Sequence, residues 1–162
     1  MSSLLPRLMV AAGCVLVLSL PLAAQQKGQA SSGGSRVQVC SLVAKAEVKK
    51  HLPWMNALDQ MPVEEEPVGA NGSSCNYPTV HVQVLAYTPN FIEALKKSGP
   101  LESISGVGDE AWFHNNKNRF AELTVKVGPR LLTLQADADD GKMDAVKPSV
   151  ISLARVYVAK LR

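Results

Sequence analysis

The segment Gly106–Ala111, with the sequence GVGDEA, holds the residues that most suggest chemistry. Asp109 and Glu110 are adjacent carboxylates, and Trp112 follows them closely. One hypothesis is that the two carboxylates serve in acid–base chemistry or bind a cation. The alternative is a tight turn into a strand, in which the glycines supply positive φ and Asp109 binds backbone amides. Adjacent residues of a strand point to opposite faces, so we favour the turn.

Three histidines, His51, His81 and His114, are the remaining candidates for acid–base or metal chemistry. None of them is paired in the HxxxH, HxH or HExxH spacing that brings metal ligands together locally. We therefore predict no metal site, no cofactor and no catalytic residue. The polar residues still define one candidate binding surface, which consists of Asp109, Glu110, Trp112, His81 and His114.

The segment Asp137–Gly141, with the sequence DADDG, resembles part of a calcium-binding loop. An EF-hand loop that began at Asp137 would need oxygen ligands at its fifth and twelfth positions. Those positions are Gly141 and Pro148, which supply no side-chain oxygen. We therefore interpret the segment as a turn between a strand and a helix, with its carboxylates near the helix N-terminus.

Residues 1–24 resemble a secretory signal peptide. Arg7 gives the positive start, Leu8–Leu20 is an almost unbroken apolar run, and Pro21–Ala24 supplies the small residues that a signal peptidase accepts. Cleavage after Ala24 would leave a flexible leader, residues 25–36, and a single domain of ordinary size, residues 37–162. We therefore expect a periplasmic or secreted protein.

Export affects the interpretation of Cys40 and Cys75, because disulfides form in oxidising compartments. An even pair of cysteines in such a compartment is most simply a disulfide. A reactive or metal-binding pair of thiols is the alternative, but no CxxC spacing and no cluster of histidines supports it. A disulfide between Cys40 and Cys75 would close a loop of 36 residues. Such a bond contributes roughly 4 kcal/mol to the free energy of unfolding, and the whole domain is stable by only about 5–15 kcal/mol.

Cys14 lies inside the apolar run, where Ala11–Cys14 resembles a lipoprotein processing box. Ala11 stands where leucine is usual, and the apolar run continues beyond the cysteine. A lipid attached there would leave an exposed apolar segment behind it. We therefore do not expect a lipid anchor at Cys14.

The charge pattern excludes some classes of partner. The chain carries a net charge of +3, which falls to +2 without Arg7, and the two signs are interspersed. A nucleic-acid-binding domain concentrates its basic residues on one stripe, so we expect no nucleic-acid partner. No second apolar stretch approaches the length of about 18 residues that spans a bilayer, so we expect no transmembrane segment after cleavage.

The first part of the domain predicts a helix and a long loop. Residues 41–52 place their apolar side chains on one stripe, and Pro53 ends this helix. Residues 59–74 contain several prolines and glycines, which favour a loop. The acidic run Glu64–Glu66 within them is most simply a solvated part of that loop.

The next part predicts strands. Residues 75–84 contain valines that alternate with polar residues, and a helix at 89–98 follows. Thr88 and Pro89 suit the start of this helix, and Gly99 suits its end. Three further strands are expected at 110–114, 119–127 and 130–136. Tight turns between alternating strands predict an antiparallel meander.

The chain ends in an amphipathic helix over 143–161, which must cover the apolar face of the sheet. Pro148 disfavours helical backbone at Lys147, so we expect a kink or a late start there. The predicted fold class is α+β: an antiparallel β-sheet with helices packed on one face, and one disulfide. The other sheet face would present the polar side chains of His81, Gln83, Glu122, Thr124, Lys126, Thr133 and Gln135.

Several short motifs together resemble a family of small exported bacterial domains of unknown function, best known from actinobacterial lipoproteins. The motifs are Cys40–Val43 opening a helix, Cys75–Tyr77 on a strand, the segment Gly106–Ala111, Leu123–Val127 and an alanine-rich closing helix. The resemblance covers most of residues 37–162. It supports the pairing of Cys40 with Cys75, and it implies no activity because none is established for the group.

The leading hypothesis is a non-catalytic exported domain that binds a small ligand or an envelope protein. Its basis is a disulfide-linked scaffold with a polar sheet face and no catalytic constellation. One alternative is a structural or inhibitory protein that acts through the loop 59–74. The other is a hydrolase that uses Asp109, Glu110 and a histidine, which requires these side chains to converge in one pocket.

Overall fold

The computed structural model describes residues 36–55, 58–116, 120–137 and 143–162. All of them belong to one of the two units into which the chain divides, Gly33–Arg162. The predicted signal peptide, almost all of the leader and most of the segment Asp137–Gly141 lie outside the described residues. None of the helices in the described ranges is both long and apolar enough to cross a membrane.

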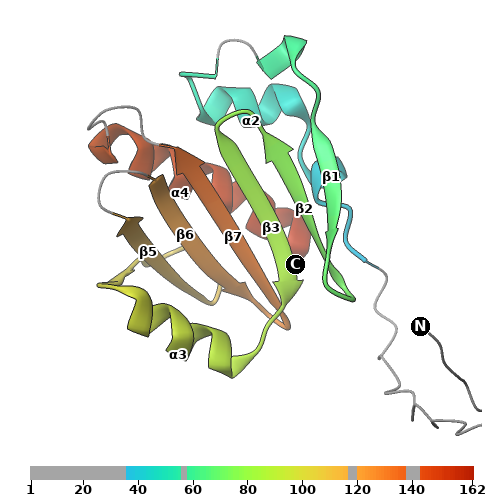
Figure 1. Cartoon of the computed structure of the whole chain (residues 1–162). Coiled ribbons are helices and arrows are strands. Elements are labelled where there is room, and N and C mark those ends of the chain that lie inside the picture. The colour runs from blue at the N-terminus through green and yellow to red at the C-terminus, as the bar shows by residue number, and fades with distance from the viewer. Residues whose placement is uncertain (1–35, 56–57, 117–119, 138–142) are drawn as a thin grey trace, which may run out of the picture. The chain divides into compact units, whose positions relative to one another are not determined.

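Among the described residues, seven strands form one antiparallel sheet in the order β1-β2-β3-β7-β6-β5-β4 (Figure 1). The strands are β1 (Glu64–Val68), β2 (Gly72–Tyr77), β3 (Val80–Ala86), β4 (Glu102–Ser103), β5 (Glu110–Asn116), β6 (Phe120–Val127) and β7 (Arg130–Asp137). The predicted α+β class is confirmed, and so is the meander from β5 to β7. Strand β3 continues the sheet by pairing with β7.

The helical elements are α1 (Val39–Leu42), α2 (Lys45–His51), the 3₁₀ helix η1 (Leu58–Gln60), α3 (Pro89–Ser98) and α4 (Met143–Leu161). Helix α4 lies behind the strands in Figure 1 and packs on β6 and β7. It is the long helix expected to cover the apolar face of the sheet. We call this covered side the inner face.

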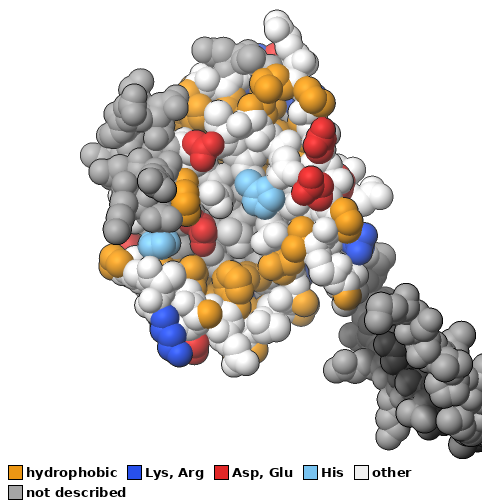
Figure 2. Space-filling model, viewed as in Figure 1, with side chains coloured by type: hydrophobic (Ala, Val, Ile, Leu, Met, Phe, Trp, Pro, Cys, Tyr) orange, Lys and Arg blue, Asp and Glu red, His pale blue; other side chains and the backbone are white. Residues whose placement is uncertain are grey.

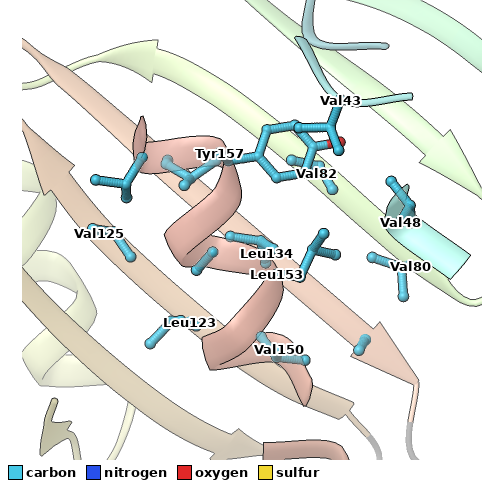
Figure 3. Packing of buried hydrophobic residues seen from close by; sticks show 14 of the residues in the cluster. Val43, Val48, Val80, Val82, Leu123, Val125, Leu134, Val150, Leu153 and Tyr157 are labelled. Atoms are coloured by element: carbon cyan, nitrogen blue, oxygen red, sulfur yellow. The ribbon is translucent and has the colours of Figure 1, made fainter. Parts of the chain in front are cut away.

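The core lies between α4 and the inner face. Figure 3 shows Val150, Leu153 and Tyr157 of α4 close to Leu123 and Leu134 of the sheet. The α4 residues recur at spacings of three and four, which places them on one side of a helix. Inward residues alternate along each strand, and those with no exposed surface include Cys75, Val82, Ala121, Leu123, Val125, Leu132, Leu134 and Ala136. The predicted disulfide joins Cys40 of α1 to Cys75 of β2, with a Cα–Cα distance of 5.1 Å.

The helix predicted over residues 41–52 is in fact two helices. α1 ends at Leu42 and α2 begins at Lys45. Between them Val43 is extended, with φ −132° and ψ 123°, and its side chain is buried in the core. The chain therefore leaves helical geometry at the point where extended backbone directs Val43 into the core.

The prediction of a loop over residues 59–74 is also wrong, although Glu64–Glu66 are exposed as predicted. The acidic run forms the edge strand β1, in which Glu65 pairs with Cys75 of β2. Glu65 Oε1 accepts hydrogen bonds of 2.6 Å from the Val39 backbone N–H and from the Ser73 hydroxyl. One carboxylate of the run thus fixes the start of α1 against the sheet.

Helix α4 includes Pro148 without the late start that we expected. The helix begins at Met143, and Lys147 is helical. Pro148 lies near the N-terminal end of the helix, so its missing N–H removes one backbone hydrogen bond there. Val146 and Val150 on either side are buried in the core, and this burial holds the segment in place.

Candidate functional site

The sheet face opposite α4, which we call the outer face, carries the side chains that alternate with the core residues. The alternation places on this face all seven residues predicted for it: His81, Gln83, Glu122, Thr124, Lys126, Thr133 and Gln135. Thr124 is nevertheless fully buried. The outer face therefore has covered parts as well as open ones.

Helix α3 covers one corner of the outer face. An added Cβ at Gly99, which follows α3, would lie 2.8 Å from His114 Nε2 on β5. Ile92 of α3 and Leu131 of β7 are both buried, and neither belongs to the main core. Whereas α1, α2 and α4 border the main core, α3 thus lies on the other side of the sheet, so the helices do not all pack on one face as predicted.

Cross-strand pairing aligns polar residues of the outer face in one line across six strands. Each residue of this line is paired with the next one on the neighbouring strand. We call this line the polar row, and its members in order are His114, Glu122, Gln135, His81, Asn76 and Glu64. Side chains of residues directly opposite each other lie about 5 Å apart, so the polar row is a continuous line of hydrogen-bonding groups.

A pocket of about 160 Å³ opens beside the polar row where β3 and β7 are paired. Its lining consists of Tyr77, Pro78, Thr79, Val80, His81, Gln135 and Asp137. His81 Nδ1 bonds to the Asn76 side-chain oxygen, which can only accept. Nδ1 therefore carries the proton, and Nε2 of the neutral ring is an acceptor. The Thr79 hydroxyl is buried and has no hydrogen-bond partner among the described residues.

Among the described residues, the ionisable groups beside this pocket are acidic apart from His81. Asp137 lines it, Glu122 is paired with Gln135, and Glu64 is paired with Asn76. No lysine or arginine is among the described residues that line it. Figure 2 shows carboxylate side chains near a histidine on this face, while lysine and arginine side chains lie towards the margin of the view.

Glu122 is the most perturbed carboxyl group of the polar row. Burial raises its pKa, and the nearby His114 and Thr124 oppose the shift. The buried Thr124 hydroxyl makes no hydrogen bond of normal geometry within the described part of the chain. The environment of Glu122 therefore disfavours its charged form, although His114 partly compensates.

The segment Gly106–Ala111 is a structural turn, as the favoured interpretation predicted. Gly108 has φ +61°, and an added Cβ would lie 2.4 Å from the Val125 side chain. Val107 is buried in the core. Asp109 Oδ2 accepts a 2.6 Å hydrogen bond from the Gly128 backbone N–H, and Asp109 N–H donates to the Lys126 carbonyl. Asp109 therefore joins two turns.

The other predicted site residues divide between two places. Glu110, Trp112 and His114 lie on the same side of β5, the side that faces α3. Glu110 forms a 3.1 Å ion pair with Lys126. His81 is three strands away from His114, and at about 4.8 Å per strand this separates the two histidines by roughly 14 Å.

This arrangement lacks the convergence that the hydrolase hypothesis requires. Asp109 and His114 are five residues apart, which is about 17 Å along extended backbone. Asp109 is also bound to the backbone of Gly128. Within the described ranges, no group of three or more His, Cys, Asp or Glu side chains is arranged to hold a metal ion.

A second arrangement, which the sequence analysis missed, joins α2 to α4. His51 Nδ1 lies 2.9 Å from Ser152 Oγ, and His51 Nε2 lies 3.3 Å from Glu47 Oε1. These residue types form catalytic triads in hydrolases, which also need N–H donors for an oxyanion. Ser152 lies in the middle of α4, where backbone N–H groups are bonded within the helix. The three side chains are therefore best explained as a contact between two helices.

Comparison with known proteins finds no family model, no curated protein and no solved structure that matches this chain. The resemblance to small exported bacterial domains stays a prediction. The candidate site therefore rests on its own geometry: the polar row and the pocket beside it.

Proposed function

We propose that this protein is a non-catalytic binding domain that takes a small ligand, or a group presented by an envelope partner, on its outer face. The pocket between His81, Gln135 and Asp137 is the observation that carries the proposal. Polar side chains converge there on strands whose opposite side is packed in the core, so they are held on rigid elements. Rigid placement lowers the entropy cost of binding.

We further propose that the protein acts in the periplasm or outside the cell. The Cys40–Cys75 disulfide supports this location, because such bonds persist in oxidising compartments. The mass of the protein purified from its own host tests it. Removal of residues 1–24 and a loss of about two daltons for the disulfide are expected, whereas an unprocessed chain with free thiols would contradict export.

An NMR screen tests the binding proposal. The full chain is expressed, purified and titrated with a library of small fragments that spans all charge classes. Ligands are expected to shift the amide signals of His81, Gln135 and Asp137. Gln135→Trp should fill the pocket and abolish these shifts, while Gln83→Trp, on the same face but outside the pocket, should preserve them. A library without hits, or with hits elsewhere on the protein, would remove the proposal.

A further inference from the structure

The pocket offers hydrogen-bond acceptors, and its lining contains no cationic side chain among the residues that the structure describes. Asp137 contributes a carboxylate, and Gln135 contributes an amide oxygen. The ring of His81, when neutral, presents Nε2 as a third acceptor, because Nδ1 is bonded to the Asn76 side-chain oxygen.

The electric field at the pocket favours a positive ligand. The whole chain is basic, with a net charge of +3, but the charged groups that the described residues place in and beside this pocket are the carboxylates of Asp137 and Glu64. Lys126, a cation of the outer face, is engaged by Glu110 and lies over the Tyr87 ring. A concave site lined by one sign of charge concentrates ligands of the opposite sign.

We propose that the pocket recognises a protonated primary amine. This inference rests on the proposed binding function and names its ligand class. A primary ammonium group donates three hydrogen bonds, which matches the acceptors of Asp137, Gln135 and His81. A quaternary ammonium group would need an aromatic cage instead. Tyr77 provides none, because it is 6% exposed and its hydroxyl is bonded to Tyr157.

The size of the pocket limits the ligand. A cavity of about 150 Å³ in another protein holds one benzene molecule, so a pocket of this volume accepts roughly six non-hydrogen atoms. That is the size of a pentylammonium ion or of a lysine side chain. The amine therefore belongs either to a small free molecule or to a lysine of a partner protein.

Titration of the ¹⁵N-labelled full chain with pentylamine at neutral pH tests this inference. We expect saturable shifts of the Thr79, His81 and Asp137 amide signals. Pentan-1-ol, which has the same chain without the charge, and tetramethylammonium, which has the charge without N–H donors, should each bind at least tenfold more weakly. Nα-acetyl-lysine amide is the second amine probe: tighter binding than pentylamine assigns the site to a lysine of a partner, and weaker binding assigns it to a free amine.

Two variants, each of which removes one negative charge, distinguish a direct contact between the amine and Asp137 from a general electrostatic attraction to the outer face. Asp137→Asn should weaken pentylamine binding about ten- to a hundredfold, because it removes a charge-assisted hydrogen bond. Glu66→Gln, on β1 and outside the pocket lining, should change binding less than about twofold. Equal losses in both variants would overturn the specific site.

The failure of this inference is distinguishable from the failure of the proposed function. If neutral or anionic fragments shift the pocket signals while pentylamine does not, the binding function stands and the amine class is wrong. If no fragment of any charge shifts them, both fail. Pentylamine shifts that persist unchanged in Asp137→Asn would also overturn the assignment.

Discussion

The two faces of the sheet have different roles: the inner face stabilises the fold, and the outer face carries the proposed binding pocket. On the inner face, Val82 and Leu134 are paired and fully buried in the core. Their neighbours in sequence, His81 and Gln135, point to the opposite face and line a pocket. The same strands β3 and β7 therefore serve both faces through an alternation of period two. At these two positions folding requires only the inner residues, Val82 and Leu134, to be apolar, so the polar His81 and Gln135 are free to be determined by binding.

The largest effect should come from Val82→Asp. The carboxylate would be buried without a partner on the inner face, and a cost of several kcal/mol is a large share of a stability of about 5–15 kcal/mol. We expect an insoluble or unfolded protein by circular dichroism. Gln83→Glu adds the same charge one residue along, on the outer face, and should remain folded. A cooperative, soluble Val82→Asp variant would break the division between the faces.

Loss of the disulfide should have the next largest effect. Cys40→Ser frees α1 from β2 and should lower the free energy of unfolding by about 2–5 kcal/mol in urea titrations. The control is the reduced parent protein, which should unfold at nearly the same urea concentration as the variant. An unchanged midpoint without reductant would mean that the bond contributes nothing, and that the inner face alone stabilises the domain.

A buried hydrogen bond on the inner side tests how strictly that face excludes unpaired polar groups. The hydroxyls of Tyr77 and Tyr157 lie 3.0 Å apart, and burial raises the pKa of both. Tyr157→Phe leaves the Tyr77 hydroxyl unpaired, and we expect a loss of about 1–3 kcal/mol in thermal or urea unfolding. The double variant Tyr77→Phe/Tyr157→Phe should recover part of the lost free energy of unfolding, because it leaves no unpaired hydroxyl. A double variant that is less stable than additivity predicts would contradict this explanation.

Local patterns predicted much of the fold. The alternation of Val80, Val82 and Val84 predicted β3, and the three- and four-residue spacing in 143–161 predicted α4. The predictions were wrong in two regions, where tertiary contacts override the local sequence pattern. Val43 fits a helical stripe in sequence, yet the core draws it into extended backbone. The acidic run has low strand propensity, but pairing with β2 and the bonds of Glu65 make it a strand.

The candidate site was only partly predictable. Alternation along the sequence is enough to identify His81 and Gln135 as outward residues. Asp137 and Thr79, which are 58 positions apart in the sequence, join them only because β3 pairs with β7. The pairing of Glu122 with His114 depends on the register between β5 and β6, and β5 continues to Asn116, beyond its predicted end. Such pairings leave no local signal in a single sequence.

The smallest effect should come from Glu122→Gln on the outer face. Burial raises the pKa of Glu122 above its ordinary value of 4.5, so between these two values the folded protein holds a proton that the unfolded chain releases. The free energy of unfolding therefore falls as the pH rises through this window. Glutamine has no such proton, so the variant should lose this part of the slope and differ from the parent by less than about 1 kcal/mol at pH 7.

Urea titrations at several pH values between about 4 and 7 measure this difference, and Glu66→Gln on the same face is the matched control. Glu66 is exposed, so Glu66→Gln removes one outer-face carboxylate but no buried one. A loss of about 2 kcal/mol or more in Glu122→Gln would show that the carboxylate holds β6 against its neighbours. The outer face would then contribute to stability as the inner face does, and the separation of roles between the two faces would have to be abandoned at the polar row.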